Sequence, residues 1–191
     1  MSWEKFCELQ GDEIAPRYRR ASKEALTLYD DERGSYKSKI ERLVDLPRSL
    51  LLVGQAGRGK THFMMALMRA LFDARKAFLG NALFYRATTL DHRLVAEFER
   101  WKTVEHFVRT LSEAHFLFID DFGVERDTAK AERDYFDLID RRTSHEKITV
   151  FSTNLSEASL KKTYGERIAS RLKECAIIEF HGPDLREGRR L

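Results

Sequence analysis

One stretch of eight residues constrains this chain more than any other feature. It lies between a short apolar run at residues 49–53 and a segment at residues 60–76 whose apolar residues recur at helical spacing. The stretch satisfies the pattern GxxxxGK[ST], and a preceding strand with a following helix is the context that this pattern requires. The sequence therefore predicts a phosphate-binding loop made of Gly54, Gln55, Ala56, Gly57, Arg58, Gly59, Lys60 and Thr61.

Each residue type in this loop has a physical reason. Glycines let the backbone turn tightly and aim successive N–H groups at phosphate oxygens. The helix that begins near Lys60 adds the positive end of its dipole. Lys60 supplies a cation for the β- and γ-phosphates, and the Thr61 hydroxyl can ligate Mg²⁺. A glycine-rich turn that matches by chance would not need the flanking strand and helix, so we expect ATP and Mg²⁺ as cofactors.

The rest of the chain alternates between strand-like and helix-like segments. Further strands are predicted at residues 82–85, 115–119, 148–152 and 176–180, with helical segments between them. Residues 1–47 are polar and mostly compatible with helix, with interruptions at residues 15–17 and 31–34. Alternation of this kind implies a parallel sheet covered on both faces, so the predicted fold is a three-layer α/β domain.

Composition excludes some classes of protein but does not identify a function. The 191 residues suit one domain, and 42% hydrophobic with 34% charged residues is typical of a soluble globular protein. A net charge of +3 permits a polyanionic partner without demanding one. Two distant cysteines and scattered histidines predict neither a disulfide framework nor a zinc site. No signal sequence or membrane-spanning run is apparent, so we expect a cytoplasmic protein with no membrane partner.

Two acidic residues follow the predicted strand at residues 115–119. A carboxylate that closes a parallel strand lies at the carboxyl edge of the sheet, so Asp120 is predicted to hold Mg²⁺ together with Thr61. Asp121 is the candidate general base for an attacking water. Many P-loop ATPases carry glutamate at this position, and aspartate is one methylene shorter. The sequence therefore predicts nucleotide binding more firmly than efficient hydrolysis. The alternative is a simple strand-ending turn, in which Asp and Gly are common.

Two further groups are candidates for contacts with the γ-phosphate. Asn154 closes the next strand, and its amide can bond the attacking water and a phosphate oxygen together, although a helix cap is the alternative. Arg167 and Arg171 lie four residues apart on a predicted helix. Spacing alone favours surface arginines that pair with Glu166 or Glu174, over an arginine finger directed at a neighbouring subunit.

The motifs and their order resemble the AAA+ ATPases of the DnaC/DnaI helicase-loader and IstB group, which are close to DnaA. The resemblance extends over about residues 14–187. It is carried by IAPRYR at residues 14–19, GKTH at 59–62, DDFGVE at 120–125, STNLS at 152–156, GERIASRL at 165–172 and GPDLR at 182–186.

This resemblance implies roles that spacing alone does not give. His62 joins the nucleotide-binding residues, and Asn154 matches the sensor that contacts the γ-phosphate. Arg171 matches the arginine finger that acts on a neighbouring subunit, with Arg167 as a second candidate. Arg186 resembles the second sensor, an arginine that contacts bound nucleotide.

The resemblance also implies how the chain is organised. Residues 14–191 would form an AAA+ (ASCE-type P-loop NTPase) domain with a minimal C-terminal lid. Residues 1–13 would be a short N-terminal segment in which Trp3, Phe6 and Leu9 can share one face of a helix. That helix is a candidate docking element, although packing against its own domain is the favoured interpretation.

The function that the resemblance implies is a replicative-helicase loader in DNA replication. It would be a slow ATPase stimulated by DNA or a partner, a homo-oligomer in ATP, and a binder of the replicative helicase and of single-stranded DNA. One alternative is an IstB-like transposition helper that assembles on DNA and recruits a transposase. Another is a nucleotide-binding adaptor with little turnover. Candidate DNA contacts are the pairs Lys161–Lys162, Arg141–Arg142 and Arg189–Arg190, although such pairs are more often plain surface.

Overall fold

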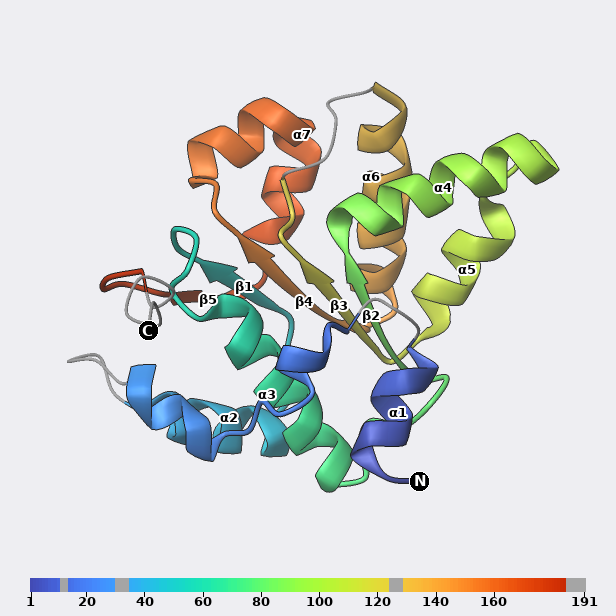
Figure 1. Ribbon diagram of the computed structural model, residues 1–191. Coiled ribbons are helices and arrows are strands. Elements are labelled where there is room, and N and C mark those ends of the chain that lie inside the picture. The colour runs from blue at the N-terminus through green and yellow to red at the C-terminus, as the bar shows by residue number, and fades with distance from the viewer. Residues whose placement is uncertain (11–13, 30–34, 124–128, 185–191) are drawn as a thin grey trace.

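A parallel sheet of five strands forms the middle of the molecule in the computed structural model, which describes residues 1–10, 14–29, 35–123 and 129–184 (Figure 1). Its strand order is β2-β3-β4-β1-β5, and all neighbouring pairs are parallel. The strands are β1 (Leu50–Val53), β2 (Ala82–Arg86), β3 (Phe116–Asp120), β4 (Ile148–Thr153) and β5 (Ala176–Glu179).

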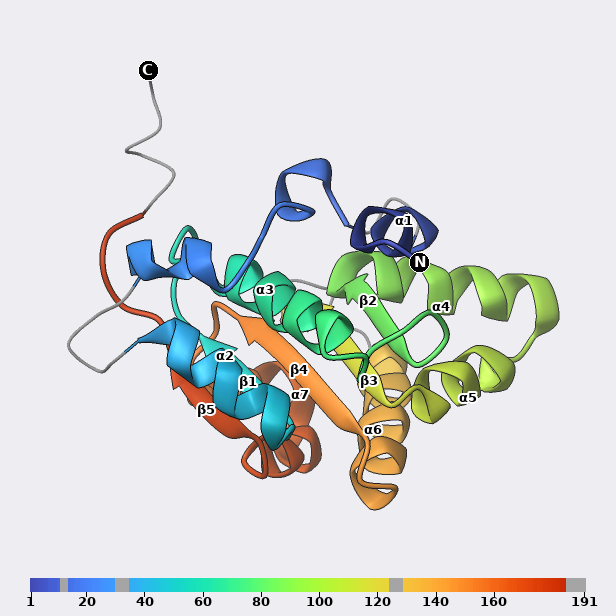
Figure 2. The same ribbon diagram turned by 90° about the horizontal axis from the view of Figure 1, so that it is seen from below.

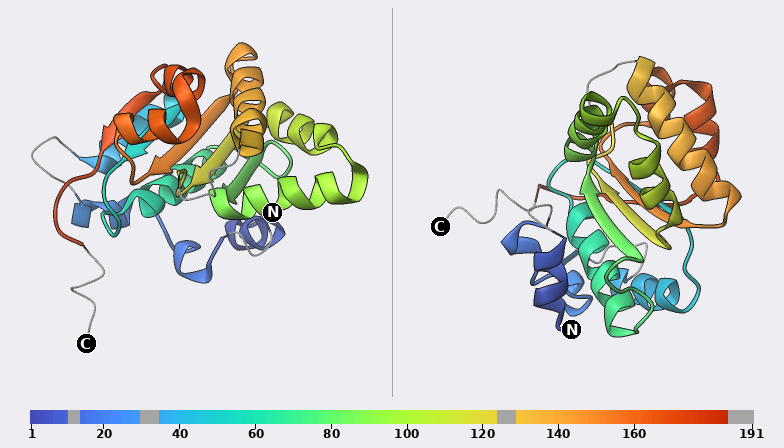
Figure 3. Two further views of the ribbon diagram at one scale, coloured as in Figure 1. Left: turned by 90° about the horizontal axis from the view of Figure 1, so that it is seen from above. Right: turned by 90° about the vertical axis from the view of Figure 1, so that its right-hand side faces the viewer.

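Helices cover both faces of this sheet, as Figures 2 and 3 show from other sides. One face packs against α1 (Trp3–Leu9), α2 (Tyr36–Asp45) and α3 (Lys60–Asp73), together with the 3₁₀ turns η2 (Pro16–Tyr18) and η3 (Glu24–Tyr29). The other face packs against α4 (Ala87–Trp101), α5 (Glu105–Glu113), α6 (Ala129–Ser144) and α7 (Glu157–Leu172). The predicted three-layer α/β fold is therefore confirmed.

Alternation along the strands divides the apolar core into two clusters. Leu50 and Leu52 of β1 belong to the cluster beneath α3, whereas Leu51 belongs to the cluster beneath α6 and α7. All five residues of β3 are buried, because this strand has a neighbour on each side and helices on both faces. Within the described residues, no helix combines the length and the apolar character needed to span a bilayer.

The amino-terminal helix packs on the domain. Trp3 and Phe6 are buried, with stacked rings whose centroids lie 5.5 Å apart, and both rings contact Phe72 of α3. Leu9, the third residue of the predicted apolar face, is 49% exposed. Two of the three residues of this predicted face therefore contribute to the core of the domain.

The residue that follows α1 covers the open edge of the sheet. The side-chain amide of Gln10 donates to the Ala82 carbonyl oxygen at 2.9 Å, and its oxygen accepts from the Phe84 N–H at 3.3 Å. One amide side chain thus satisfies a donor and an acceptor on β2, the edge strand. Covering an edge in this way removes a template for unwanted strand pairing.

Arg142 of α6 is the largest fully buried side chain among the described residues, with 1% of its surface exposed. Burial lowers the pKa of its guanidinium to about 9, so the group remains a cation at neutral pH. It donates to the hydroxyl of Thr149 at 2.8 Å and to the carbonyl oxygens of Leu111, Ala114, His115 and Ile148. The side chain thereby joins the end of α5 to the start of β4.

This burial corrects one expectation from the sequence. A DNA contact through the Arg141–Arg142 pair is wrong for Arg142, whose side chain does not reach the surface. Arg141 is partly exposed and pairs with Asp137, one turn earlier on α6, at 2.9 Å. Consecutive residues of a helix do not face the same direction, so a run of two charges does not make a patch of two charges.

We expect Arg142→Met to lower the free energy of unfolding by about 2–4 kcal/mol, because several buried carbonyl groups lose their donor. Urea denaturation followed by circular dichroism measures the change. Arg141→Ala is the matched control, with an expected loss within about 0.5 kcal/mol for an exposed pair. Equal stability of the Arg142→Met variant and the parent would contradict a structural role for this guanidinium.

Candidate nucleotide-binding site

The predicted phosphate loop connects β1 to the first turn of α3 at the carboxyl edge of the sheet. The Gly54 N–H donates to the Thr153 carbonyl oxygen of β4 at 3.2 Å, which continues the strand pairing into the loop. A Cβ atom at Gly54 would lie 2.5 Å from the carbonyl oxygen of Phe180. Only glycine fits at this position, because the obstacle is backbone and cannot turn aside.

Lys60 lies beneath this loop with 5% of its surface exposed. Its Nζ donates to the carbonyl oxygens of Gly54 at 2.6 Å and Gln55 at 2.9 Å, and to Oδ1 of Asn154 at 2.6 Å. Asn154 follows β4 directly, so a single ammonium group links the phosphate loop to the end of the neighbouring strand. The structure therefore brings together two site residues that lie far apart in the sequence.

Thr61 and Asp120 form the second half of the site. The Thr61 hydroxyl lies 3.0 Å from both carboxyl oxygens of Asp120, which is 3% exposed. Burial raises the pKa of Asp120, and the neighbouring Asp121 carboxylate raises it further, whereas hydrogen bonds from Ser152 and Thr61 lower it. A cation bound beside Asp120 would stabilise its ionised form and so offset the effect of burial.

The donor set fits magnesium bound together with a nucleotide. A hydroxyl and a carboxylate side by side are oxygen ligands of the kind that Mg²⁺ prefers. Among the residues that the structure describes, no group of three or more His, Cys, Asp or Glu side chains is placed to hold a metal ion by itself. Magnesium with so few protein ligands typically completes its coordination with water and phosphate oxygens. Thr61 and Asp120 would therefore hold it only together with a bound nucleotide.

Asp121 lies next to Asp120 but in a different setting. Its side chain is exposed at the edge of the sheet, and its backbone adopts the left-handed conformation with φ of 57°. Aspartate tolerates this conformation better than most residues. The turn that follows β3 thus places one carboxyl group inside the site and the next at its rim.

The remaining predicted loop residues surround this centre. Gln55 and Ala56 are exposed, and the Arg58 guanidinium donates to Oε1 of Gln55 at 3.0 Å. The His62 ring meets the Tyr18 ring edge-on, with centroids 5.9 Å apart, so η2 packs beside the start of α3.

The segment before Arg186 also reaches the loop. A Cβ atom at Gly57 would lie 1.8 Å from a carboxyl oxygen of Asp184, so Asp184 packs directly on the phosphate loop. Arg186 itself lies outside the described residues, as do Arg189 and Arg190. Of the other candidate DNA contacts, Lys161 forms an ion pair with Glu166.

Arg171 lies at the opposite edge of the sheet from the phosphate loop. It lines a cavity of about 240 Å³ together with Ser49, Lys147 and Cys175, which precede β1, β4 and β5. These residues mark the amino-terminal ends of the strands. A strand of six residues such as β4 spans about 20 Å, so Arg171 does not take part in the phosphate site of its own chain.

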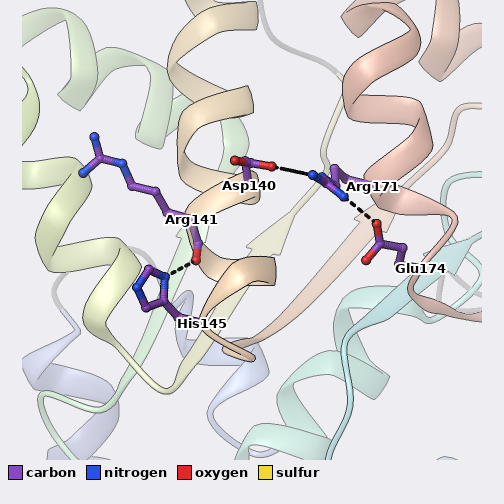
Figure 4. A network of polar contacts seen from close by, with 5 residues as sticks. All are labelled: Asp140, Arg141, His145, Arg171 and Glu174. Atoms are coloured by element: carbon purple, nitrogen blue, oxygen red, sulfur yellow. Dashed lines mark hydrogen bonds and ion pairs between the residues drawn. The ribbon is translucent and has the colours of Figure 1, made fainter.

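The two candidate arginines of α7 make different contacts. Arg171 pairs with Asp140 of α6 and with Glu174, as Figure 4 shows. Arg167 instead lies over the ring of Phe136, with its guanidinium carbon 5.2 Å from the ring centroid. Sequence spacing favours the pairing with Glu174, whereas it does not indicate Asp140.

Sequence reasoning also missed Ser152 of β4. Its hydroxyl is fully buried, donates to Oδ1 of Asp120 at 2.5 Å and accepts from the Asp121 N–H at 2.9 Å. One hydroxyl therefore fixes the position of both candidate acidic residues. The available signal was a polar residue within an apolar strand, but its partners follow from β3 and β4 being neighbours, which the sequence does not reveal.

We expect Ser152→Ala to raise the Mg²⁺ concentration needed for half-maximal ATP binding by about 10–100-fold, as for other residues that orient a metal ligand. Titration of a fluorescent ATP analogue at several Mg²⁺ concentrations measures this change. Ser112→Ala is the control, because the Ser112 hydroxyl bonds only the Val108 carbonyl of its own helix among the contacts described. An unchanged Mg²⁺ requirement in Ser152→Ala would mean that Thr61 alone positions Asp120.

Comparison with known proteins extends these observations. YdaV of Escherichia coli strain K12, described as uncharacterized, is 27% identical over 137 residues, which are 71% of this chain and 53% of YdaV. The replicative helicase loader DnaC of Buchnera aphidicola subsp. Schizaphis graminum is 24% identical over 127 residues, which are 65% of this chain and 50% of that protein. The chain spans about half the length of these two relatives.

The comparison with solved structures concerns the fold. A crystal structure of the DnaC helicase loader matches with a TM-score of 0.76 at 22% identity, covering 87% of this chain and 100% of that one. The family model described as IstB-like ATP binding protein matches residues 39–186. That match begins within α2 and runs past β5, so it includes the entire sheet and the phosphate loop. The chain therefore belongs to the family of IstB-like ATP-binding proteins and has the AAA+ P-loop fold that the DnaC helicase loader also has.

Proposed function

We propose that this protein binds and hydrolyses ATP with Mg²⁺ and loads a replicative helicase during DNA replication. The observation that carries the proposal is the junction at the carboxyl edge of the sheet, where Lys60 bonds Asn154 and Thr61 bonds Asp120. This junction joins a phosphate cradle to an acidic group on a neighbouring strand, which is the arrangement that phosphoryl transfer requires. The similarity to DnaC supports the helicase as partner.

Each residue of the junction has a role in this proposal. The loop amides and Lys60 hold the triphosphate, and Thr61 and Asp120 hold Mg²⁺, which supplies neutralising charge on the phosphate oxygens when it is bound. Asp121, at the rim, takes the proton of the attacking water. The Asn154 amide then orients that water, once Lys60 donates to phosphate instead of to Asn154.

Hydrolysis in this proposal needs two copies of the chain. Arg171 lies at the amino-terminal edge of the sheet, and in this proposal it acts on the nucleotide of another molecule. Arg167, the second candidate, lies on the same helix but over an aromatic ring. We therefore infer an ATP-dependent homo-oligomer, with slow turnover by the oligomer alone and faster turnover on single-stranded DNA or on the partner. The second sensor is assigned to Arg186.

A second candidate function is favoured by the family match itself. The matching model is that of IstB-like proteins, so a transposition helper that assembles on DNA and recruits a transposase fits the same ATP site. A third is a nucleotide-binding adaptor in which Asp121, exposed and one methylene shorter than glutamate, supports little turnover. The loader remains preferred because the DDFGVE motif at residues 120–125 resembles that of loaders more closely than that of IstB-type proteins.

We expect Asp121→Asn to leave ATP affinity unchanged and to lower phosphate release by about 100-fold or more, since loss of a general base removes that much catalysis. Lys60→Ala should instead weaken ATP binding by about 10–100-fold, because a charged donor to the phosphates is lost. Equilibrium binding and a phosphate-release assay separate the two effects. Equal phosphate release by Asp121→Asn and the parent would leave the adaptor as the better description.

We expect the protein to co-elute with the hexameric replicative helicase of its own organism when ATP and Mg²⁺ are present, and to separate from it without nucleotide. Size-exclusion chromatography with light scattering tests this. Lys60→Ala is the control, which should not co-elute at the same ATP concentration. Failure to bind the helicase, together with ATP-dependent filaments on duplex DNA in electron micrographs, would favour the transposition helper.

A further inference from the structure

The guanidinium of Arg171 is held between two carboxyl groups from different parts of the chain (Figure 4). Oδ1 of Asp140 accepts from Nε at 3.1 Å and from Nη2 at 2.7 Å. Oε1 of Glu174 accepts from Nη1 at 2.9 Å. These bonds use three of the five N–H groups that a guanidinium carries.

This arrangement does little for the stability of the fold. The side chains of Arg171, Asp140 and Glu174 are 38%, 37% and 50% exposed, and exposed ion pairs contribute little to folding. These ion pairs instead fix the orientation of the Arg171 side chain, which is otherwise long and flexible. Asp140 restricts the guanidinium more than Glu174 does, because it lies on a different helix, α6, and accepts hydrogen bonds from two nitrogens. Glu174 accepts from one nitrogen and lies only three residues after Arg171.

The neighbouring residues show that the pairing is specific. Asp137, one turn earlier on α6, pairs with Arg141 and not with Arg171. Figure 4 shows Arg141 directed away from Asp140 and Arg171. Arg167, one turn earlier on α7, packs on Phe136. Of these two aspartates on α6, only Asp140 bonds the arginine that the proposed function uses.

We propose that Asp140 is a positioning residue for the trans-acting Arg171. It would hold the guanidinium in the orientation in which the remaining N–H groups meet the triphosphate of a neighbouring chain. The inference rests on the proposed function, in which Arg171 completes the site of another molecule. Because Asp140 acts through Arg171, it should matter only in the chain that supplies the arginine, and be dispensable in the chain that supplies the ATP site.

Mixing of two inactive variants tests this asymmetry. Chains with Arg171→Ala keep an ATP site but lack the arginine, and chains with Lys60→Ala keep the arginine but lack the ATP site. A mixture of the two should recover phosphate release that neither has alone. Asp140→Ala is then added either to the Lys60→Ala chain or to the Arg171→Ala chain.

We expect phosphate release to fall about tenfold or more when Asp140→Ala is in the arginine-supplying chain, and to stay unchanged when it is in the other chain. Asp140→Asn in the arginine-supplying chain should recover part of the rate, because its oxygen still accepts hydrogen bonds. Asp137→Ala, placed in the same chain, is the matched control and should have no effect. All variants should melt within about 4 °C of their parents, as expected for exposed ion pairs.

The possible failures are distinguishable. If the first mixture recovers no phosphate release, the trans-acting arginine of the proposed function is wrong, and the role of Asp140 with it. If the mixture is active but Asp140→Ala has no effect, or an equal effect in either chain, the pair is an ordinary surface contact. A faster rate with Asp140→Ala in the arginine-supplying chain would show that Asp140 restrains Arg171 instead of positioning it.

Discussion

The buried carboxyl group of Asp120 is the point on which the rest of the site depends. It lies at the end of β3, bonds the first turn of α3 through Thr61, and bonds β4 through Ser152. Burial raises its pKa, so the free protein bears a cost for keeping this group ionised. The same cost favours a cation beside it. The site is thus arranged for a bound state at some expense to the unbound one, as is common where function requires a buried polar group.

The phosphate loop is held at the same edge of the sheet by Lys60. Lys60 is nearly buried, and it bonds backbone oxygens of the loop and the Asn154 amide. A buried ammonium group needs such partners, because it has lost its water. The three central strands β3, β4 and β1 therefore meet at their carboxyl ends through the side chains that the proposed function assigns to the nucleotide. A substitution at this edge should alter packing and binding together.

Much of this could be predicted from the sequence, because the information was local. The loop pattern lies within eight residues, and the apolar run before Asp120 reflects a strand that is buried on both faces. The partners Ser152 and Asp140 could not be predicted in the same way. Ser152 requires knowing that β3 and β4 are neighbours, and Asp140 requires knowing how α6 packs beside α7. Neither follows from spacing along the chain.

Two arginines near the amino-terminal edge show how partners set what a guanidinium can do. Arg142 is buried and donates to carbonyl and hydroxyl oxygens of the fold. If its guanidinium moved away, several buried oxygens would lose their hydrogen-bond donor. Arg171 is partly exposed, and its partners are carboxylates that water can solvate equally well. A phosphate oxygen is chemically similar to a carboxylate oxygen and bonds a guanidinium in the same geometry. Of these two arginines, only Arg171 can therefore bond a phosphate without cost to the core, which is a physical reason for the proposal that it, and not its buried neighbour, acts on a second molecule.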